Sequence, residues 1–112
     1  MDAEDRFWDL AEELLVTRTG VTRSTMMGFP CLRIHGGFFA TFDRRNGQAV
    51  VKLPAERVAD LVATGAALPF APAGRTFREW AAIPPSDAES WPGLVEEALS
   101  FVASLRKQGA TH

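Results

Sequence analysis

The chain has 112 residues and a formal net charge of −2, with 46% hydrophobic and 23% charged residues. This length excludes a two-domain protein, and neither the hydrophobicity nor the net charge is typical of a disordered chain. We expect a single domain over residues 1–107 and a flexible C-terminal tail over residues 108–112.

Cysteine content and hydropathy bear on the location of the protein. The single cysteine, Cys31, excludes an internal disulfide and cannot by itself form a structural zinc site. This cysteine content is compatible with a location in the reducing cytosol. The N-terminal residues are acidic where a signal peptide is basic, and no apolar run approaches the ~20 residues that span a bilayer. We therefore expect a cytoplasmic protein without a membrane partner. Its preference for arginine and alanine indicates a bacterial coding sequence rich in G and C.

The first predicted helix spans residues 2–16. Apolar residues recur along it at the spacing of one helical face. They are Phe7, Leu10, Ala11, Leu14 and Leu15. The helix is expected to end near Arg18, with Gly20 as its stop. Its opposite face is acidic and is either simply solvated or a loose site for a hard cation. The residues concerned are Asp5, Asp9, Glu12 and Glu13, and we expect no metal there.

Residues 21–53 contain short β-prone runs separated by turn residues. This spacing predicts an antiparallel meander of three or four strands rather than βαβ units. The pair Asn46-Gly47 is the strongest turn signal, because both residues tolerate the positive φ of tight hairpin turns. Residues 35–37 form the preceding hairpin. Alternation assigns the run 38–42 to two faces, with Phe38, Ala40 and Phe42 on one and Phe39 and Thr41 on the other.

The second half of the chain predicts a helix, a loop, a strand and a last helix. A helix begins at Pro54, where the missing N–H costs nothing, and ends at Gly65. Residues 66–74 form a loop, and residues 75–83 form a strand. The last helix has its apolar face over residues 94–105. It begins either at Ser86, with a capping box of the S-x-x-E form, or after Ser90.

This order of elements predicts a two-layer α+β domain, in which the helices pack on one face of an antiparallel sheet. The other face of the sheet is then available for binding.

Charge is distributed unevenly along the chain. Residues 1–16 carry a formal charge of −5, residues 17–85 carry +5 and residues 86–112 carry −2. The basic central region could attract phosphate, and Phe38, Phe39 or Trp80 could stack on bases if exposed. Alternatively, its basic residues line strand edges, pair with the acidic helices and keep the protein soluble. They are Arg18, Arg23, Arg33, Arg44, Arg45, Lys52, Arg75 and Arg78.

Five of the central residues are candidates for nucleic-acid contact. Four would bind phosphate and one would stack or anchor: Arg33, Lys52, Arg75 and Arg78, with Trp80 as the aromatic residue. Alternation within a strand over residues 75–83 assigns Arg78 and Trp80 to one face and Arg75, Phe77 and Glu79 to the other. All five therefore cannot belong to one surface.

No catalytic constellation is visible in the sequence. The only histidines, His35 and His112, lie in no motif with acids or serine. A Cys31–His35 pair on one strand would share a face but lie about 13 Å apart, too far to touch. We expect a protein that is not an enzyme and that has no cofactor and no metal.

Five short segments form a pattern along the chain: TMMGFPCLR at 25–33, FFA at 38–40, VVKLP at 50–54, PF at 69–70 and GRTFREW at 74–80. In this order they resemble segments of the MmcQ/YjbR-like proteins and of the related N-terminal domain of TfoX-type competence regulators. The resemblance implies a small α+β domain like the type III secretion chaperones, in the order α-β-β-β-α-β-β-α. Members are often labelled DNA-binding, and the family offers no agreed catalytic residues to carry over. Two features depart from the family pattern: the second TfoX-type domain is absent and the end of the chain is acidic. Both weaken the case for a direct regulatory role.

The sequence thus predicts a non-enzymatic binding or regulatory domain that contacts DNA through the basic sheet region. The alternative is a chaperone-like or adaptor-like protein–protein module, or a homodimer, using an exposed apolar patch that includes Phe38, Phe39 or Phe77. A third hypothesis is a small-ligand pocket beneath residues 66–74.

Overall fold

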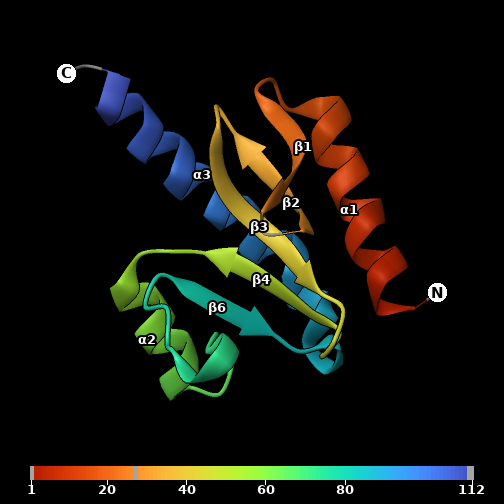
Figure 1. Cartoon of the computed structure of the whole chain (residues 1–112), viewed down its shortest axis with the longest axis vertical. Coiled ribbons are helices and arrows are strands. Elements are labelled where there is room, and N and C mark those ends of the chain that lie inside the picture. The colour runs from red at the N-terminus through yellow and green to blue at the C-terminus, as the bar shows by residue number, and fades with distance from the viewer. Residues whose placement is uncertain (1, 27, 111–112) are drawn as a thin grey trace.

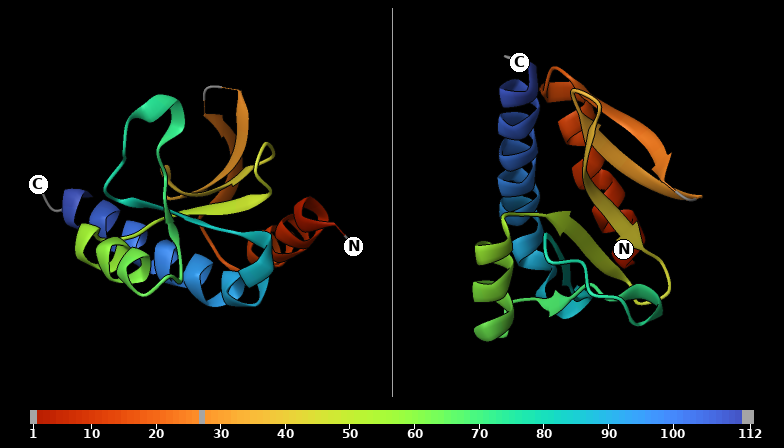
Figure 2. Two further views of the ribbon diagram at one scale, coloured as in Figure 1. Left: turned by 90° about the horizontal axis from the view of Figure 1, so that it is seen from below. Right: turned by 60° about the vertical axis from the view of Figure 1, so that its left-hand side comes forward.

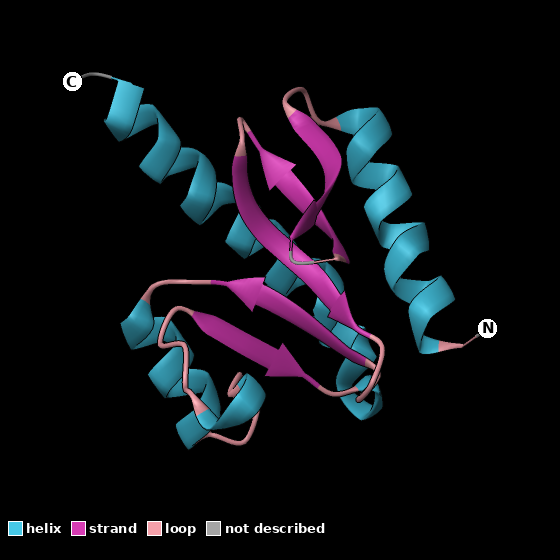
Figure 3. Ribbon diagram, in the orientation of Figure 1, coloured by secondary structure: helices cyan, strands magenta, loops and turns pink. Residues whose placement is uncertain are grey.

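The computed structural model describes residues 2–26 and 28–110, and in this part of the chain three helices accompany one six-stranded antiparallel sheet (Figures 1 and 3). The helices are α1 (Ala3–Thr17), α2 (Ala55–Ala63) and α3 (Trp91–Ala110). The strands are β1 (Val21–Met26), β2 (Phe29–Ile34), β3 (Gly37–Asp43), β4 (Gln48–Lys52), β5 (Leu68–Pro69) and β6 (Trp80–Ile83). The sheet order is β1-β2-β3-β4-β6-β5, which confirms the predicted α+β fold. Four strands precede α2, one more than the resemblance implies.

All three helices cover the same face of the sheet. Their buried residues form one hydrophobic cluster with strand residues that run from Val21 in the edge strand β1 to Ile83 in β6. Figure 2 (left) shows the helices gathered below the strands. This arrangement confirms the predicted two-layer packing and leaves the opposite face of the sheet without a helix.

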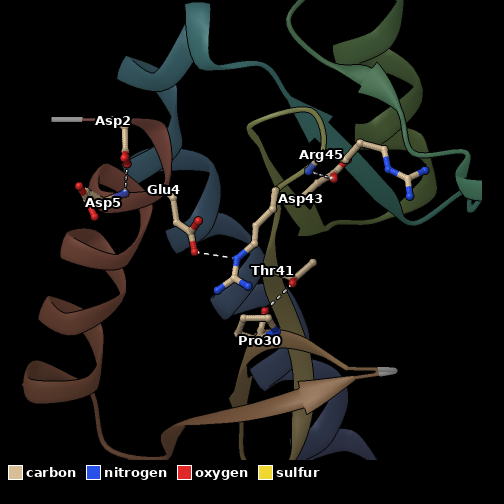
Figure 4. Close-up of polar contacts among 8 residues, drawn as sticks. Asp2, Glu4, Asp5, Pro30, Thr41, Asp43 and Arg45 are labelled. Atoms are coloured by element: carbon tan, nitrogen blue, oxygen red, sulfur yellow. Dashed lines mark hydrogen bonds and ion pairs between the residues drawn. The ribbon is translucent and has the colours of Figure 1, made fainter.

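The start of α1 follows directly from the sequence. Asp2 caps the helix, since its Oδ1 accepts a hydrogen bond of 2.8 Å from the N–H of Asp5 (Figure 4). The helix ends at Thr17 with Arg18 as its C-cap, as the periodicity predicted. Gly20 follows with φ +92°, and a Cβ there would lie 2.4 Å from the ring of His35. The turn after α1 therefore requires glycine.

A β-bulge in the second hairpin changes the predicted faces of β3. Leu32 pairs with Ala40, but Arg33 pairs with Phe38, so Phe39 is the extra residue of β3. Phe39 is fully buried in the helix-side cluster, whereas Phe38 shares the side of Arg33. The prediction that Phe38 shares a face with Ala40 is wrong, because alternation breaks at the bulge.

The β3–β4 connection is longer than the sequence suggested. Asp43 pairs with Gln48, which leaves a four-residue loop, and only Gly47 in it has positive φ. The side chain of Asp43 organises this loop: its Oδ1 accepts a 3.0 Å bond from the N–H of Arg45 (Figure 4), and its Oδ2 accepts one of 2.8 Å from Asn46. Asn46 thus acts through its side chain rather than through a left-handed backbone.

Two boundaries in the second half of the chain concern α3. Of the two predicted starts of this helix, the one after Ser90 is confirmed, because α3 begins at Trp91 and Pro85–Ser90 is a 3₁₀ turn in which the capping box at Ser86 does not form. The expected end of the domain at residue 107 falls inside α3, which continues to Ala110. Residues 111–112, the end of the predicted tail, lie outside the described residues.

Gly37, the first residue of β3, packs directly against α3. A Cβ at Gly37 would lie 2.7 Å from Cγ1 of Val102 and 3.0 Å from Cδ of Arg106. Gly37→Ala is therefore expected to lower the free energy of unfolding by about 1–3 kcal/mol through overpacking, measured by urea denaturation. Gly93→Ala is the matched control: a Cβ there meets nothing within 4 Å, and the change should raise helix stability by up to about 1 kcal/mol. Equal effects of the two changes would contradict the predicted contact.

Candidate nucleic-acid interface

The candidate site is the face of the sheet turned away from the helices, here called the open face. Its middle row runs across all six strands by direct cross-strand pairing. The row is Ser24, Cys31, Thr41, Val50, Ala82 and Leu68. Most of these side chains are small, so they form a low floor between larger neighbours.

This floor is enclosed although no helix covers it. Cys31, Val50 and Ala82 are 1%, 0% and 1% exposed, yet none of them belongs to the helix-side cluster. The β1–β2 hairpin and the segment 70–79 both rise on this side of the sheet (Figure 2, left). Side chains on the open side therefore shield the floor. The hydroxyl of Thr41 is satisfied within it, donating a 2.6 Å hydrogen bond to the carbonyl oxygen of Pro30 (Figure 4).

Three of the five predicted contact residues lie on the open face in the row beside this floor. Arg33 pairs across the strands with Phe38, and Lys52 pairs with Trp80. The guanidinium carbon of Arg33 lies 4.5 Å from the centroid of the Phe38 ring, and its Nε donates a 3.0 Å bond to the carbonyl oxygen of Gly36. This row therefore alternates cationic and aromatic side chains.

The other two predicted residues, Arg75 and Arg78, are not in a strand. β6 begins only at Trp80, so the predicted strand over residues 75–83 is wrong for its first five residues. The N–H of Trp80 bonds the carbonyl oxygen of Phe77 at 3.2 Å, which makes Arg78 a central residue of a turn. Alternation does not apply there, and the prediction that Arg75 must face away from Trp80 loses its basis. Both arginines are exposed on the segment that rises beside the open face.

A pair of phenylalanines that the sequence analysis did not link organises this segment. The rings of Phe70 and Phe77 lie 6.0 Å apart, and the N–H of Phe77 bonds the carbonyl oxygen of Phe70 at 3.0 Å. The guanidinium carbon of Arg75 lies 5.7 Å from the Phe77 ring centroid. The only signal in the sequence is two aromatic residues that flank a proline- and glycine-containing loop.

Ion pairs divide the basic residues into two groups. Arg18 pairs with Glu96, Arg44 with Glu4 at 2.8 Å (Figure 4 shows this contact at Glu4), and Arg57 with Glu97 at 2.7 Å. For Arg18 and Arg44, the alternative of pairing with the acidic helices is confirmed. Within the described residues, the second group makes no ion pair within 4 Å: Arg6, Arg23, Arg33, Arg45, Lys52, Arg75, Arg78 and Arg106. It includes all four of the predicted phosphate-binding residues, Arg33, Lys52, Arg75 and Arg78.

Charge is separated between the two layers of the fold. Twelve of the fourteen acids lie in the helices, at the N-cap of α1 or in the 3₁₀ turn before α3. Eight of the twelve basic residues lie in the strands and their connections, together with only two acids, Asp43 and Glu79. The near-zero net charge of the chain therefore hides a positive sheet layer and a negative helix layer.

Cys31 lies in the floor and His35 in the β2–β3 turn, so they do not form a catalytic pair. The backbone of His35 is held by Gly20, whose carbonyl oxygen accepts its N–H at 3.0 Å, and by Arg106, which bonds its carbonyl oxygen at 3.2 Å. In the described part of the chain no hydrogen bond joins His35 to the Cys31 thiol. Burial raises the pKa of that thiol, and the charge of Arg33 opposes this effect only in part.

The raised pKa makes Cys31 a test of the enclosed floor. The folded protein holds the thiol proton more tightly than the unfolded chain does, so this contribution to stability is complete below the ordinary thiol pKa. It is lost as the pH rises above about 8.5 and through the folded pKa. We expect slow labelling by a thiol reagent in native buffer at pH 8 and fast labelling in urea. Equal rates would contradict the enclosure, and Cys31→Ala provides the blank.

Comparisons with protein-family models, curated proteins and solved structures give no match for this chain. Among the described residues, no three His, Cys, Asp or Glu side chains gather closely enough to hold a metal ion. No helix in the same residues is both long and apolar enough to cross a membrane.

Proposed function

We propose that the open face binds the phosphate backbone of a nucleic acid. The observation that carries the proposal is the group of four cationic side chains without an ion pair, at or beside one face of a domain in which twelve of the fourteen acids lie in the opposite layer. A polyanion that approaches this face meets positive charge, and it meets negative charge on the helix side.

The chemistry of these side chains suits phosphate. Arg33 uses Nε for the carbonyl oxygen of Gly36, so its remaining N–H groups are available to phosphate oxygens. Lys52 adds a compact ammonium group on β4, beside Trp80. Arg75 and Arg78 extend the positive charge along the segment at the edge of the face.

The second candidate function is a protein–protein module. Phe29, Leu68 and Phe77 are the large apolar side chains exposed near the open face, whereas Phe39, which the sequence offered for such a patch, is fully buried. A protein partner would need these side chains rather than the cations. Membership of the MmcQ/YjbR-like family, a cytoplasmic location and the lack of enzymatic activity stay predictions.

Fluorescence anisotropy of labelled DNA at low and physiological salt tests the proposal. We expect an affinity that falls steeply with salt, and Arg33, Lys52, Arg75 or Arg78 replaced singly by Ala should each lower the logarithmic salt slope by up to about 1. Arg57→Ala removes the same charge from the helix layer and is the control, with little expected change. Absence of binding at low salt overturns the proposal and favours the protein–protein candidate.

A further inference from the structure

Trp80 is an aromatic residue of the open face that has no aromatic ring or guanidinium stacked on it among the described residues. Arg33 lies over Phe38, Arg75 lies over Phe77, and Phe77 also faces Phe70. No such ring or guanidinium partner of Trp80 occurs among the described residues, and its side chain is half-buried. A half-buried indole ring on the surface of a sheet, with no ring or guanidinium stacked on it, can serve as a stacking platform for another flat group.

The positive charge beside the Trp80 ring is suited to the phosphate groups of a nucleotide. Lys52 is the direct cross-strand partner of Trp80, and Arg33 lies in the same row two strands further on. Phe29, 55% exposed, offers a comparable ring at another corner of the open face. There, however, the cross-strand partner of Phe29 is Met26 of β1, so no cation is paired with that ring.

We propose that the nucleic acid on the open face is single-stranded, with one unpaired base stacked on Trp80 and the neighbouring phosphates bound by Lys52 and Arg33. This inference rests on the proposed function and narrows it to one class of ligand. In a duplex, base faces are covered by stacking and only their edges are accessible in the grooves. A stacking platform on a sheet therefore serves unpaired bases, which can leave the strand axis.

The layout of the domain argues against a duplex in a second way. Duplex DNA is commonly read by a helix or a two-stranded ribbon that enters the major groove. The helices of this domain lie on the far side of the sheet, and together with the N-cap of α1 and the 3₁₀ turn before α3 they carry twelve of the fourteen acids. The length of the row from Arg33 in β2 to Trp80 in β6 also sets the size of the ligand. The row crosses three strand spacings, roughly 14 Å. A single strand of about four nucleotides, stacked at a rise of 3.4 Å each, has the same length.

The test compares a labelled single strand of about ten thymidines with a duplex of the same length, at low salt. We expect the single strand to bind about 10-fold more tightly than the duplex, and Trp80→Ala to weaken single-strand binding about 10-fold while changing duplex binding less than about 2-fold. Trp80→Phe keeps a ring and should retain much of the affinity. Phe29→Ala, the matched control, should have little effect.

Tryptophan fluorescence gives an independent measurement. The single strand should quench the emission of the wild type and of Trp8→Phe, but much less that of Trp80→Phe. Binding of the duplex as tightly as the single strand, or equal losses from Trp80→Ala and Phe29→Ala, overturns this inference and leaves phosphate binding by the open face intact. Absence of binding by either DNA overturns both proposals together.

Discussion

Replacement of Trp91 by alanine is expected to lower the free energy of unfolding by about 3–5 kcal/mol. Trp91 is 1% exposed at the start of α3, and its ring centroid lies 6.4 Å from that of Phe7 and 6.2 Å from that of Phe42. Its Nε1 also donates a 3.2 Å hydrogen bond to the carbonyl oxygen of Ile83. One side chain thus joins α1, β3, β6 and α3. Urea denaturation followed by circular dichroism measures the loss.

Trp91→Phe distinguishes the contribution of the aromatic ring to stability from that of the hydrogen bond. It keeps most of the apolar volume but leaves the carbonyl oxygen of Ile83 without its donor, which costs about 1–3 kcal/mol. Trp8→Phe is the control, because Trp8 is half-buried and has no such hydrogen bond among the described residues. A domain has only about 5–15 kcal/mol of stability in all, so Trp91→Ala should be close to unfolding at 37 °C. A loss below about 1 kcal/mol would contradict the central position of Trp91.

The helices could be predicted from the sequence because their signals are local. The apolar spacing from Phe7 to Leu15 and the proline at the start of α2 each act within one or two turns of chain. The meander was predictable for the same reason, since glycine turns separate its strands. The ends of α3 are less predictable: the sequence left its start open between Ser86 and the position after Ser90, and the helix continues to Ala110, because competing turns at helix ends differ little in free energy.

The bulge at Phe39 could not be predicted, because it depends on how β3 registers against β2. Alternation is a property of one strand, but the side that a residue faces changes wherever two residues oppose one. Likewise, the segment 75–79 looks β-prone by itself. It is a loop because Phe77 contacts Phe70, and this contact closes the chain between these two residues. Both outcomes depend on contacts between separate parts of the chain.

The composition of the candidate site was predicted better than its geometry. The residue types indicated a basic and aromatic region, and Arg33, Lys52 and Trp80 prove to share one row of the open face. Which arginines have acidic partners depends on tertiary contacts such as Arg18 with Glu96, which are 78 residues apart in the chain. The separation of charge into layers therefore becomes visible only when the helices are placed.

Lys52→Glu is the change expected to affect nucleic-acid binding most. It replaces the cation beside Trp80 by an anion on the open face, so one attractive contact becomes a repulsive one. At the effective dielectric of a protein surface, a charge pair about 4 Å apart contributes about 4 kcal/mol before solvation and entropy reduce it. We expect the affinity for single-stranded DNA to fall about 100-fold at low salt, measured by anisotropy.

The dependence on salt and on position distinguishes a local contact from a general effect of net charge. Arg57→Glu changes the net charge by the same amount but acts on α2, in the layer that the proposal places away from DNA. Its effect should be less than about 3-fold and should vanish near physiological salt, where the Debye length is only about 8 Å. A direct contact by Lys52 is screened less, so its loss should persist in part at that salt. Similar losses of affinity from Lys52→Glu and Arg57→Glu would mean that binding depends on the net charge of the whole domain. The open face would then have no special role.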